Sequence, residues 1–193
     1  MMKLNKVKIV FCDIDGTLLE MGKTEITPNM RKALCSLKQN GIKICIATGR
    51  PFATIPMFEG VVFDAILAFN GSFCTVGEQV VAKCPIPKED VKKIIENAKR
   101  MERPVSIATA EEIVANGSDK DLEDYFAIAH HRVNVSEKFE EYLEKDVFQI
   151  MLGCDLEERK YILEGTKNAK LAAWWDRACL LYTSPSPRDR SLS

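Results

Sequence analysis

Residues 7–17 constrain the fold of this chain most strongly, because an apolar run there ends abruptly in two acids and a glycine. The run Val7-Lys8-Ile9-Val10-Phe11-Cys12 is rich in β-branched and aromatic residues, a composition typical of a buried strand. Asp13-Ile14-Asp15-Gly16-Thr17 follows at once. Since open parallel α/β sheets place their active sites at the carboxyl edge, the sequence predicts a strand that delivers two carboxylates there.

The spacing of the two acids indicates a chemistry. Residues two apart on an extended backbone point the same way, so Asp13 and Asp15 are expected to converge while Ile14 faces packed structure. Gly16 can adopt the positive φ that turns the chain away. Two close carboxylates repel each other unless a divalent cation such as Mg²⁺ lies between them. We therefore predict covalent phosphoryl transfer, in which one aspartate attacks phosphorus and the other moves the proton.

A second strand is expected over residues 42–47, after a helix that begins with Thr27 as N-cap and Pro28 in its first turn. A strand, helix, strand succession of this length implies a right-handed parallel crossover. The second strand ends in Thr48-Gly49-Arg50-Pro51. A hydroxyl, a guanidinium and the amides of a helix predicted to begin at Pro51 together indicate a phosphate site.

A third strand, residues 65–69, ends in Asn70-Gly71. This dipeptide is typical of a hairpin turn, and residues 72–75 and 80–83 are predicted to pair beyond it. Further along, Cys84-Pro85-Ile86-Pro87 interrupts the α/β rhythm and predicts a hinge. The mixture of strands and helices predicted after it, which includes a helix over residues 156–164, is typical of a separate α+β unit.

Residues 13–19 resemble the first signature of the haloacid-dehalogenase-like phosphatases, and Ala47-Thr48-Gly49-Arg50-Pro51 is similar to the second signature in the Cof-type branch. The resemblance covers residue 3 to about residue 178. It implies an α/β fold with an incomplete, Rossmann-like three-layer parallel-sheet core at residues 1–83 and an inserted α+β cap domain at residues 84–178.

The resemblance also implies roles for individual residues. Asp13 would be the nucleophile and a Mg²⁺ ligand, and Asp15 would supply a main-chain carbonyl to the metal and a side chain that acts as acid and then base. Thr48 would hold a phosphoryl oxygen. The remaining predicted phosphate- and substrate-binding residues are Gly16, Thr17, Gly49, Arg50 and Asn70. For Asn70, a substrate contact and a simple turn both stay open.

The implied function is a Mg²⁺-dependent phosphomonoester hydrolase that acts through an aspartyl-phosphate on a small phosphorylated metabolite. A sugar phosphate, pyridoxal phosphate, and a nucleotide or flavin phosphate are equally compatible with the residues. Two alternatives stay open. A phosphotransferase or phosphomutase would use the same aspartate, and a non-catalytic fragment would bind weakly at most.

The same resemblance implies a later lysine and a Gly-Asp-x-x-Asn-Asp-like stretch, neither of which occurs in this sequence. Residues 179–193 instead resemble translated sequencing adapter, and we expect a non-native, disordered tail there. Without the missing strands, the strand that bears Asp13 should be an exposed apolar edge. The 193-residue chain is therefore expected to aggregate or fold loosely and to show no Mg²⁺-dependent turnover.

Composition and charge limit the classes of partner that we expect. A net charge of −1 without a block of Lys or Arg argues against nucleic-acid and membrane partners. The N-terminal apolar run is too short for a signal peptide or a membrane span. Seven cysteines occur without a Cys-x-x-Cys pair, which predicts reduced thiols in a cytoplasmic protein. They are Cys12, Cys35, Cys45, Cys74, Cys84, Cys154 and Cys179. The oligomeric state is not readable.

Overall fold

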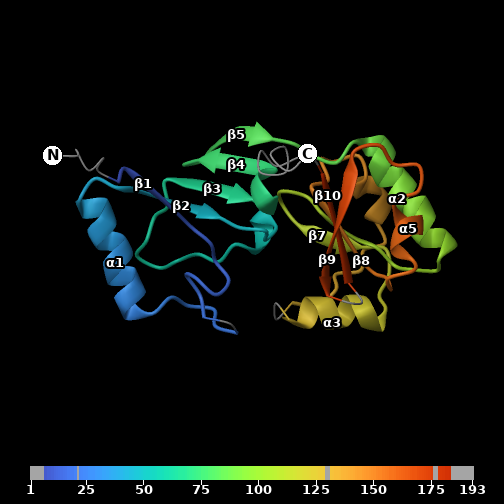
Figure 1. Ribbon diagram of the computed structural model, residues 1–193, viewed down its shortest axis with the longest axis horizontal. Helices are drawn as coiled ribbons and strands as arrows, with labels where there is room; N and C mark the ends of the chain where they lie inside the picture. Colours follow the sequence, from blue (N-terminus) through green and yellow to red (C-terminus); the bar gives the residue numbers. More distant parts are fainter. Residues whose placement is uncertain (1–6, 21, 129–130, 176–177, 184–193) are drawn as a thin grey trace.

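Two five-stranded sheets lie side by side in the computed structural model, which describes residues 7–20, 22–128, 131–175 and 178–183 (Figure 1). The first sheet has the strand order β1-β2-β3-β4-β5 and the second the order β7-β6-β8-β10-β9. The strands are β1 (Ile9–Cys12), β2 (Lys43–Ala47), β3 (Ala65–Ala68), β4 (Phe73–Val76), β5 (Gln79–Lys83), β6 (Ser106–Ala108), β7 (Ile113–Ala115), β8 (Gln149–Gly153), β9 (Ala169–Trp175) and β10 (Ala178–Thr183). The helices are α1 (Pro28–Gln39), α2 (Lys88–Arg100), α3 (Lys120–Ile128), α4 (Phe139–Tyr142) and α5 (Arg159–Ile162), with 3₁₀ turns η1 (Phe52–Thr54) and η2 (Phe69–Gly71).

The first sheet has the predicted parallel crossover. Strand β2 pairs in parallel with both β1 and β3, whereas β4 and β5 extend the sheet as antiparallel strands. Helix α1 connects β1 to β2 and begins as expected, because Thr27 Oγ1 accepts a hydrogen bond of 3.1 Å from the N–H of Met30. Gly41 ends it with a φ of +75°. The α/β class predicted from the sequence is confirmed.

One face of the first sheet is packed and the other is open at β1. Val10 and Cys12 belong to the apolar cluster that includes Leu34 of α1. Ile9 and Phe11 alternate with them and are 46% and 53% exposed. Because β1 is the edge strand of its sheet, the side chains of Ile9 and Phe11 and one side of the β1 main chain lack cover among the described residues. This is the exposed apolar edge that the sequence predicted.

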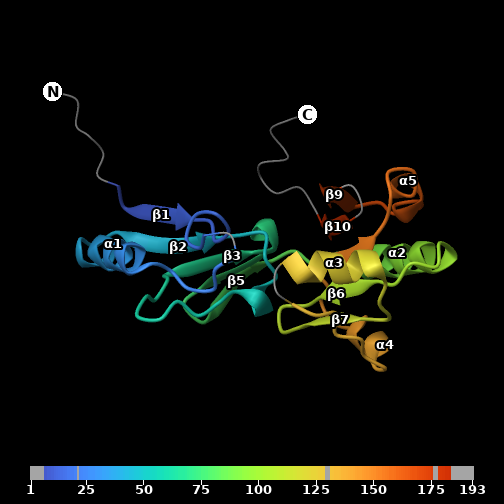
Figure 2. The same cartoon turned by 90° about the horizontal axis from the view of Figure 1, so that it is seen from below.

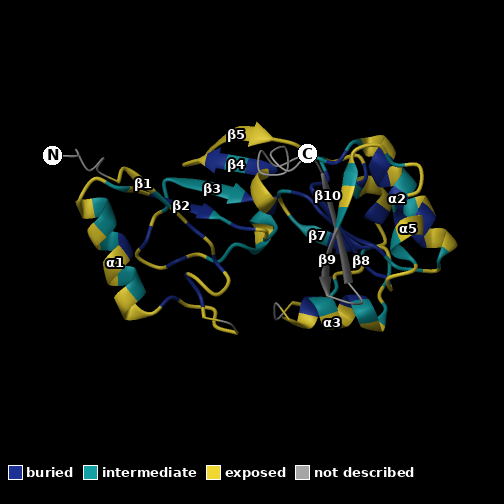
Figure 3. Cartoon of the chain, viewed as in Figure 1, coloured by how far each residue is buried: buried dark blue, intermediate teal, exposed yellow. Residues whose placement is uncertain are grey.

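The second sheet is covered on both faces. Helices α2 and α5 pack on one face, through an apolar cluster that includes Ile94, Ile150 and Ile162. Helix α3 packs on the other face, where Leu122 and Phe126 join a second cluster. Every residue of β8 is buried, and Figure 3 shows this strand in the middle of the buried region. The second sheet with its helices is an α+β unit of the kind predicted.

The segment between β5 and α2 joins the two sheets. The N–H of Cys84 donates to the carbonyl of Ser72 at 2.7 Å, and the N–H of Ile86 donates to the carbonyl of Val147 at 2.7 Å. Lys83 and Asp146 form an ion pair beside them. We propose that this segment divides a core, residues 1–83, from a cap, residues 84–178.

Two predicted helices are shorter in the structure. The helix expected to begin at Pro51 is a single 3₁₀ turn, η1, so the prediction of helix amides for a phosphate is wrong. The helix expected near residues 156–164 is reduced to α5.

The predicted tail and thiols also differ from the structure in part. Strand β10 pairs with β8 and β9, so the first residues of the tail expected from residue 179 are hydrogen-bonded strand; residues 184–193 lie outside the described residues. Cys12, Cys35, Cys45 and Cys74 are free thiols, but Cys154 is disulfide-bonded, so the expectation of a reduced thiol is wrong for Cys154. None of the helices in the described part of the chain combines the length and the apolar composition that a bilayer span requires.

Candidate active site

The turn after β1 presents two acids on the same side of the chain. Asp13 and Asp15 are exposed, whereas Ile14 between them is fully buried. Gly16 has a φ of +76°, and its N–H donates to the carbonyl of Leu19 at 2.8 Å, while the N–H of Leu19 donates back to Ile14 at 2.8 Å. The tight turn that the sequence predicted at Gly16 therefore forms, and it fixes the main chain under both acids.

Asp13 is partly fixed by its own neighbour. Its Oδ1 accepts a hydrogen bond of 2.8 Å from the N–H of Ile14, which engages one carboxylate oxygen and leaves the other for chemistry. Its main-chain carbonyl accepts the N–H of Leu18 at 3.2 Å. Thr17 lies in the same exposed turn and donates its N–H to Ile14 at 3.3 Å.

A bidentate ion pair connects the ends of β1 and β2. Arg50 Nε donates to Asp15 Oδ2 at 2.8 Å, and Arg50 Nη2 donates to Asp15 Oδ1 at 2.7 Å. Arg50 Nη1 also donates to the carbonyl of Thr54 in η1 at 3.3 Å. The hydrogen bonds to Asp15 raise the pKa of Arg50; its partial burial opposes this, and the charges of Asp15 and Asp13 add to the rise. Both predicted catalytic acids therefore lie near one guanidinium.

Thr48 lies at the end of β2 and is buried. Its N–H donates to the carbonyl of Leu67 in β3 at 2.9 Å, and its Oγ1 accepts the N–H of Arg50 at 3.1 Å. The hydroxyl proton is thus left to donate to a further acceptor, as a phosphate-binding threonine requires.

Asn70 lies against the loop that holds Thr48. Its φ is +55°, and its N–H donates to the carbonyl of Thr48 at 3.0 Å. A Cβ atom added to Gly49 would lie 3.1 Å from Asn70 Oδ1, so Gly49 permits this close approach. Asn70 is exposed and forms part of the turn from β3 to β4, which are antiparallel. The turn reading is confirmed, and the ligand contact stays a prediction.

These residues share one edge, which faces the second sheet. The arrows of β2 and β3 point toward the second sheet in Figure 1, and the arrow of β1 does so in Figure 2. All eight residues predicted for the site lie at or just after these strand ends. Thr48 is buried, and the other seven are exposed or partly buried. The sequence did not predict the pairing of Arg50 with Asp15, because residues 35 positions apart carry no local signal of contact.

Metal ligands are few in the described part of the chain. No group of three or more His, Cys, Asp or Glu side chains gathers there. Two oxygen donors nevertheless suit Mg²⁺, namely the Asp13 carboxylate and the Asp15 carbonyl; the latter accepts none of the described backbone hydrogen bonds that close the turn.

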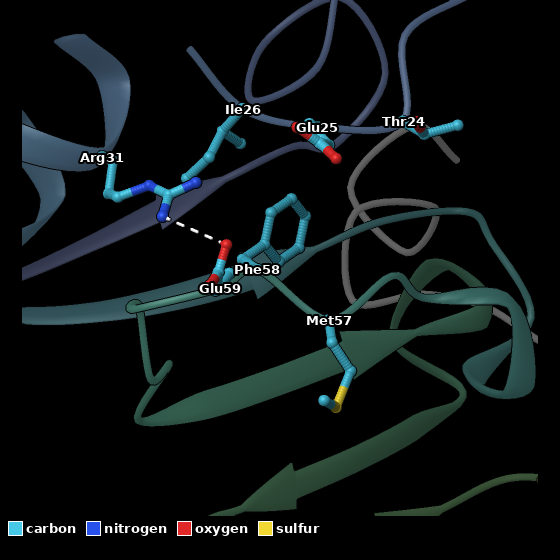
Figure 4. A pocket seen from close by; sticks show the side chains of 7 residues that line it. All are labelled: Thr24, Glu25, Ile26, Arg31, Met57, Phe58 and Glu59. Carbon is cyan, nitrogen blue, oxygen red and sulfur yellow. Dashed lines mark ion pairs between the residues drawn. The ribbon is translucent and has the colours of Figure 1, made fainter. Parts of the chain in front are cut away.

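A small pocket lies away from these residues (Figure 4). Its volume is about 90 Å³, and its walls contain none of the predicted site residues. Arg31 and Glu59 form an ion pair of 3.5 Å across it. The lining residues are Thr24, Glu25, Ile26, Arg31, Met57, Phe58 and Glu59.

Comparison with known proteins gives a consistent result. A family model described as haloacid dehalogenase-like hydrolase matches residues 10–176. YkrA of Bacillus subtilis (strain 168), a provisional phosphatase by its name, is 30% identical over 156 residues, which are 79% of this chain and 60% of YkrA. The chain thus spans about three fifths of the length of this relative.

Solved structures agree on the fold. BT1666 from Bacteroides thetaiotaomicron, studied among phosphatases of the haloalkanoate enzyme superfamily, has a TM-score of 0.82 at 24% identity, over 95% of this chain and 69% of that one. BT4131, a sugar phosphatase of HAD subclass IIB, has a TM-score of 0.74 at 26% identity, over 92% of this chain and 70% of that one.

Proposed function

The chain belongs to the haloacid dehalogenase-like hydrolase family, and on that premise we propose that the whole protein hydrolyses phosphomonoesters through an aspartyl-phosphate. One observation carries the proposal. Asp13 and Asp15 leave a single tight turn on the same side, and Arg50 from the neighbouring strand end holds the second of them. One small region therefore contains a nucleophile (Asp13), a group that can carry a proton (Asp15) and a guanidinium that can bind the phosphoryl group (Arg50).

In this proposal Asp13 is the nucleophile. The carboxylate oxygen that is not bonded to Ile14 attacks phosphorus, and the bond from phosphorus to the leaving oxygen breaks. Asp15 gives its proton to that leaving oxygen. Asp15 then takes a proton from the water that attacks phosphorus, which releases phosphate and regenerates the Asp13 carboxylate.

The ion pair of Asp15 with Arg50 imposes a condition on this cycle. A bidentate guanidinium stabilises the charged carboxylate, whereas a general acid must first hold a proton. We propose that the phosphoryl group of the substrate competes for Arg50 and loosens the pair as it binds. The Thr48 hydroxyl would then donate to a phosphoryl oxygen, and Asn70 and Gly49 would shape the wall beside it.

Mg²⁺ fits the donors at this turn. The Asp13 carboxylate and the Asp15 carbonyl would hold it, and the ion would offset negative charge on the phosphoryl group. The family resemblance calls for a further carboxylate, which the described residues do not supply. We accordingly propose that the 193-residue chain alone shows no turnover.

The substrate is proposed to be a small phosphorylated metabolite, with a sugar phosphate as the first class to test. The support is the similarity to BT4131, which is named as a sugar phosphatase, and the position of the second sheet opposite the site. A phosphotransferase would pass the same phosphoryl group to a sugar hydroxyl instead of water. We also propose a cytoplasmic location, which the free thiols of Cys12, Cys35, Cys45 and Cys74 favour and the disulfide at Cys154 opposes.

The test uses the protein expressed from its full genomic reading frame. Phosphate release is measured over a panel of sugar, pyridoxal and nucleotide phosphates, with and without Mg²⁺. We expect Mg²⁺-dependent release and a phosphorylated Asp13 peptide in mass spectra of rapidly quenched samples. Asp13→Asn should abolish both, whereas Asp124→Asn, which alters only an exposed ion pair on α3, should change neither. Full activity in Asp13→Asn would refute the proposal, and a phosphorylated acceptor in place of free phosphate would indicate the phosphotransferase.

A further inference from the structure

Two consecutive residues at the end of β3 have an unusual backbone conformation. Phe69 and Asn70 have φ values of +50° and +55°, in the left-handed region that non-glycine residues seldom adopt. A bulky aromatic residue is especially disfavoured there, so the surrounding structure must hold it in place. Phe69 is 2% exposed, which indicates that packing of its ring supplies the compensating contacts.

The ring that packs on Phe69 comes from the second sheet. Phe148, immediately before β8, stacks on Phe69 with ring centroids 5.1 Å apart and an interplanar angle of 23°. Phe148 also meets Phe73 of β4 edge to face at 5.3 Å, and Phe73 meets Phe52 of η1 at 5.0 Å. Phe148 is 1% exposed. Phe69 and Phe73 from the first sheet therefore both pack on the ring of Phe148.

The strained turn is hydrogen-bonded to the candidate phosphate loop on both sides. The N–H of Phe69 donates to the carbonyl of Arg50 at 3.0 Å, and the N–H of Asn70 donates to the carbonyl of Thr48 at 3.0 Å. A shift of Phe69 would therefore move the main chain at both ends of residues 48–50. The loop would move with the ring rather than with the rest of β2.

We propose that Phe148 is a positioning residue, which holds the loop of residues 48–50 from the second sheet through its stacking on Phe69. The effect of Phe148 on catalysis rests on the proposed phosphatase function. Its effect on the position of residues 48–50 does not. The second sheet then contributes to phosphate binding without touching the phosphate, because it fixes the backbone that carries Thr48 and Arg50.

Hydrogen exchange tests the connection without any substrate. Phe148→Leu should speed exchange of the Phe69 and Asn70 amides by about tenfold relative to other amides of the first sheet, since an aromatic pair contributes up to roughly that factor. Ile150→Val is the matched control, because Ile150 follows Phe148 by two residues, in β8, but packs in the cluster under α2 and α5. It should leave those two amides unchanged. Equal effects of the two variants, or none in Phe148→Leu, would overturn the proposal.

A double-mutant cycle adds the second readout. Phe148→Leu alone should lower kcat about tenfold. If Phe148 affects turnover through its stacking on Phe69, the double variant Phe69→Leu/Phe148→Leu should lower kcat no further. Additive losses would show that Phe148 does not act through Phe69. If the wild-type protein expressed from its full genomic reading frame is inactive, the phosphatase function is refuted and the exchange result alone decides the positioning. An active wild type with equal kcat in Phe148→Leu and Ile150→Val would refute the positioning alone.

Discussion

The two sheets differ in how completely they are covered. In the first, Ile9 and Phe11 of β1 are exposed, and so is every residue of β5. In the second, every residue of β8 is buried between apolar clusters on its two faces. The candidate chemistry lies on the first sheet, where polar contacts such as the pairing of Arg50 with Asp15 organise the site. The second sheet is instead organised by apolar burial, which contributes most of the free energy of folding.

This difference predicts that activity and stability can be separated by mutation. Substitutions at the ends of β1 and β2 should change turnover far more than unfolding, and substitutions inside the second sheet should do the reverse. Variants of the two sheets test this separation when turnover and unfolding are measured for each.

The largest effect is expected for Asp13→Asn. The amide cannot attack phosphorus, so kcat should fall by at least about 10⁴-fold, as for other removed nucleophiles. Because Asp13 is exposed, the free energy of unfolding should change by less than about 0.5 kcal/mol. Turnover assays and urea unfolding on the same preparations measure both quantities. Unfolding that shifts as far as turnover would contradict the separation.

The next effect compares an isoleucine from each sheet. Ile150→Ala should lower the free energy of unfolding by about 2–5 kcal/mol, because Ile150 is fully buried. Ile9→Ala removes the same atoms from a side chain that is 46% exposed and should cost well under half as much. Chemical denaturation of both variants gives the two values. Equal costs would mean that β1 is covered in solution.

A smaller, pH-dependent effect is expected at Asp90 on α2. Burial would raise the pKa of Asp90, but hydrogen bonds from the N–H groups of Lys167, Asn168 and Ala169 together lower it. The charged form therefore stabilises the second sheet above the unfolded pKa of about 3.9, and this contribution is lost as the pH falls through the lower folded pKa.

Asp90→Asn should accordingly lower the free energy of unfolding by about 1–3 kcal/mol at neutral pH. The difference between variant and wild type should shrink as the pH falls below about 4. Thermal unfolding at several pH values between about 7 and about 3 measures this difference in the free energy of unfolding. A difference that is constant over the whole range would show that the charge on Asp90 contributes nothing.

The smallest effect is expected for Gly49→Ala. The new Cβ would lie 3.1 Å from Asn70 Oδ1, so Asn70 must shift by a few tenths of an ångström. Since misplacement by about 1 Å can cost about 100-fold, kcat/KM should fall by only about two- to fivefold. The same substitution made together with Asn70→Ala should have no further effect. A persistent loss there would assign the effect to Gly49 itself.

Local signals made the frame of the first sheet predictable. The apolar run before Asp13, the positive φ at Gly16 and the Thr27 cap each depend on residues within a few positions of one another, and the structure contains all three. The exposed β1 edge was instead expected from the family resemblance, because this sequence lacks the later strands that the resemblance places beside β1.

Contacts between distant segments were not predictable. The orientation of Arg50 depends on Asp15, which is 35 positions away and which the residues around Arg50 do not reveal. The left-handed conformation of Phe69 opposes its intrinsic preference, and its ring stacks on Phe148, a residue 79 positions away. Likewise, β10 is a strand because β8 and β9 supply partners on both sides, which overrides the expectation from its composition.

The open edge of β1 has a consequence for the acid that follows it. Any element that pairs with β1 and covers Ile9 and Phe11 also stiffens the strand whose next residue is Asp13. Aggregation through that edge and correct completion of the sheet would compete for the same hydrogen-bonding groups. The reactivity of the Asp13 carboxylate would then depend on which strand has paired with β1. A molecule whose β1 edge has paired incorrectly would also be inactive.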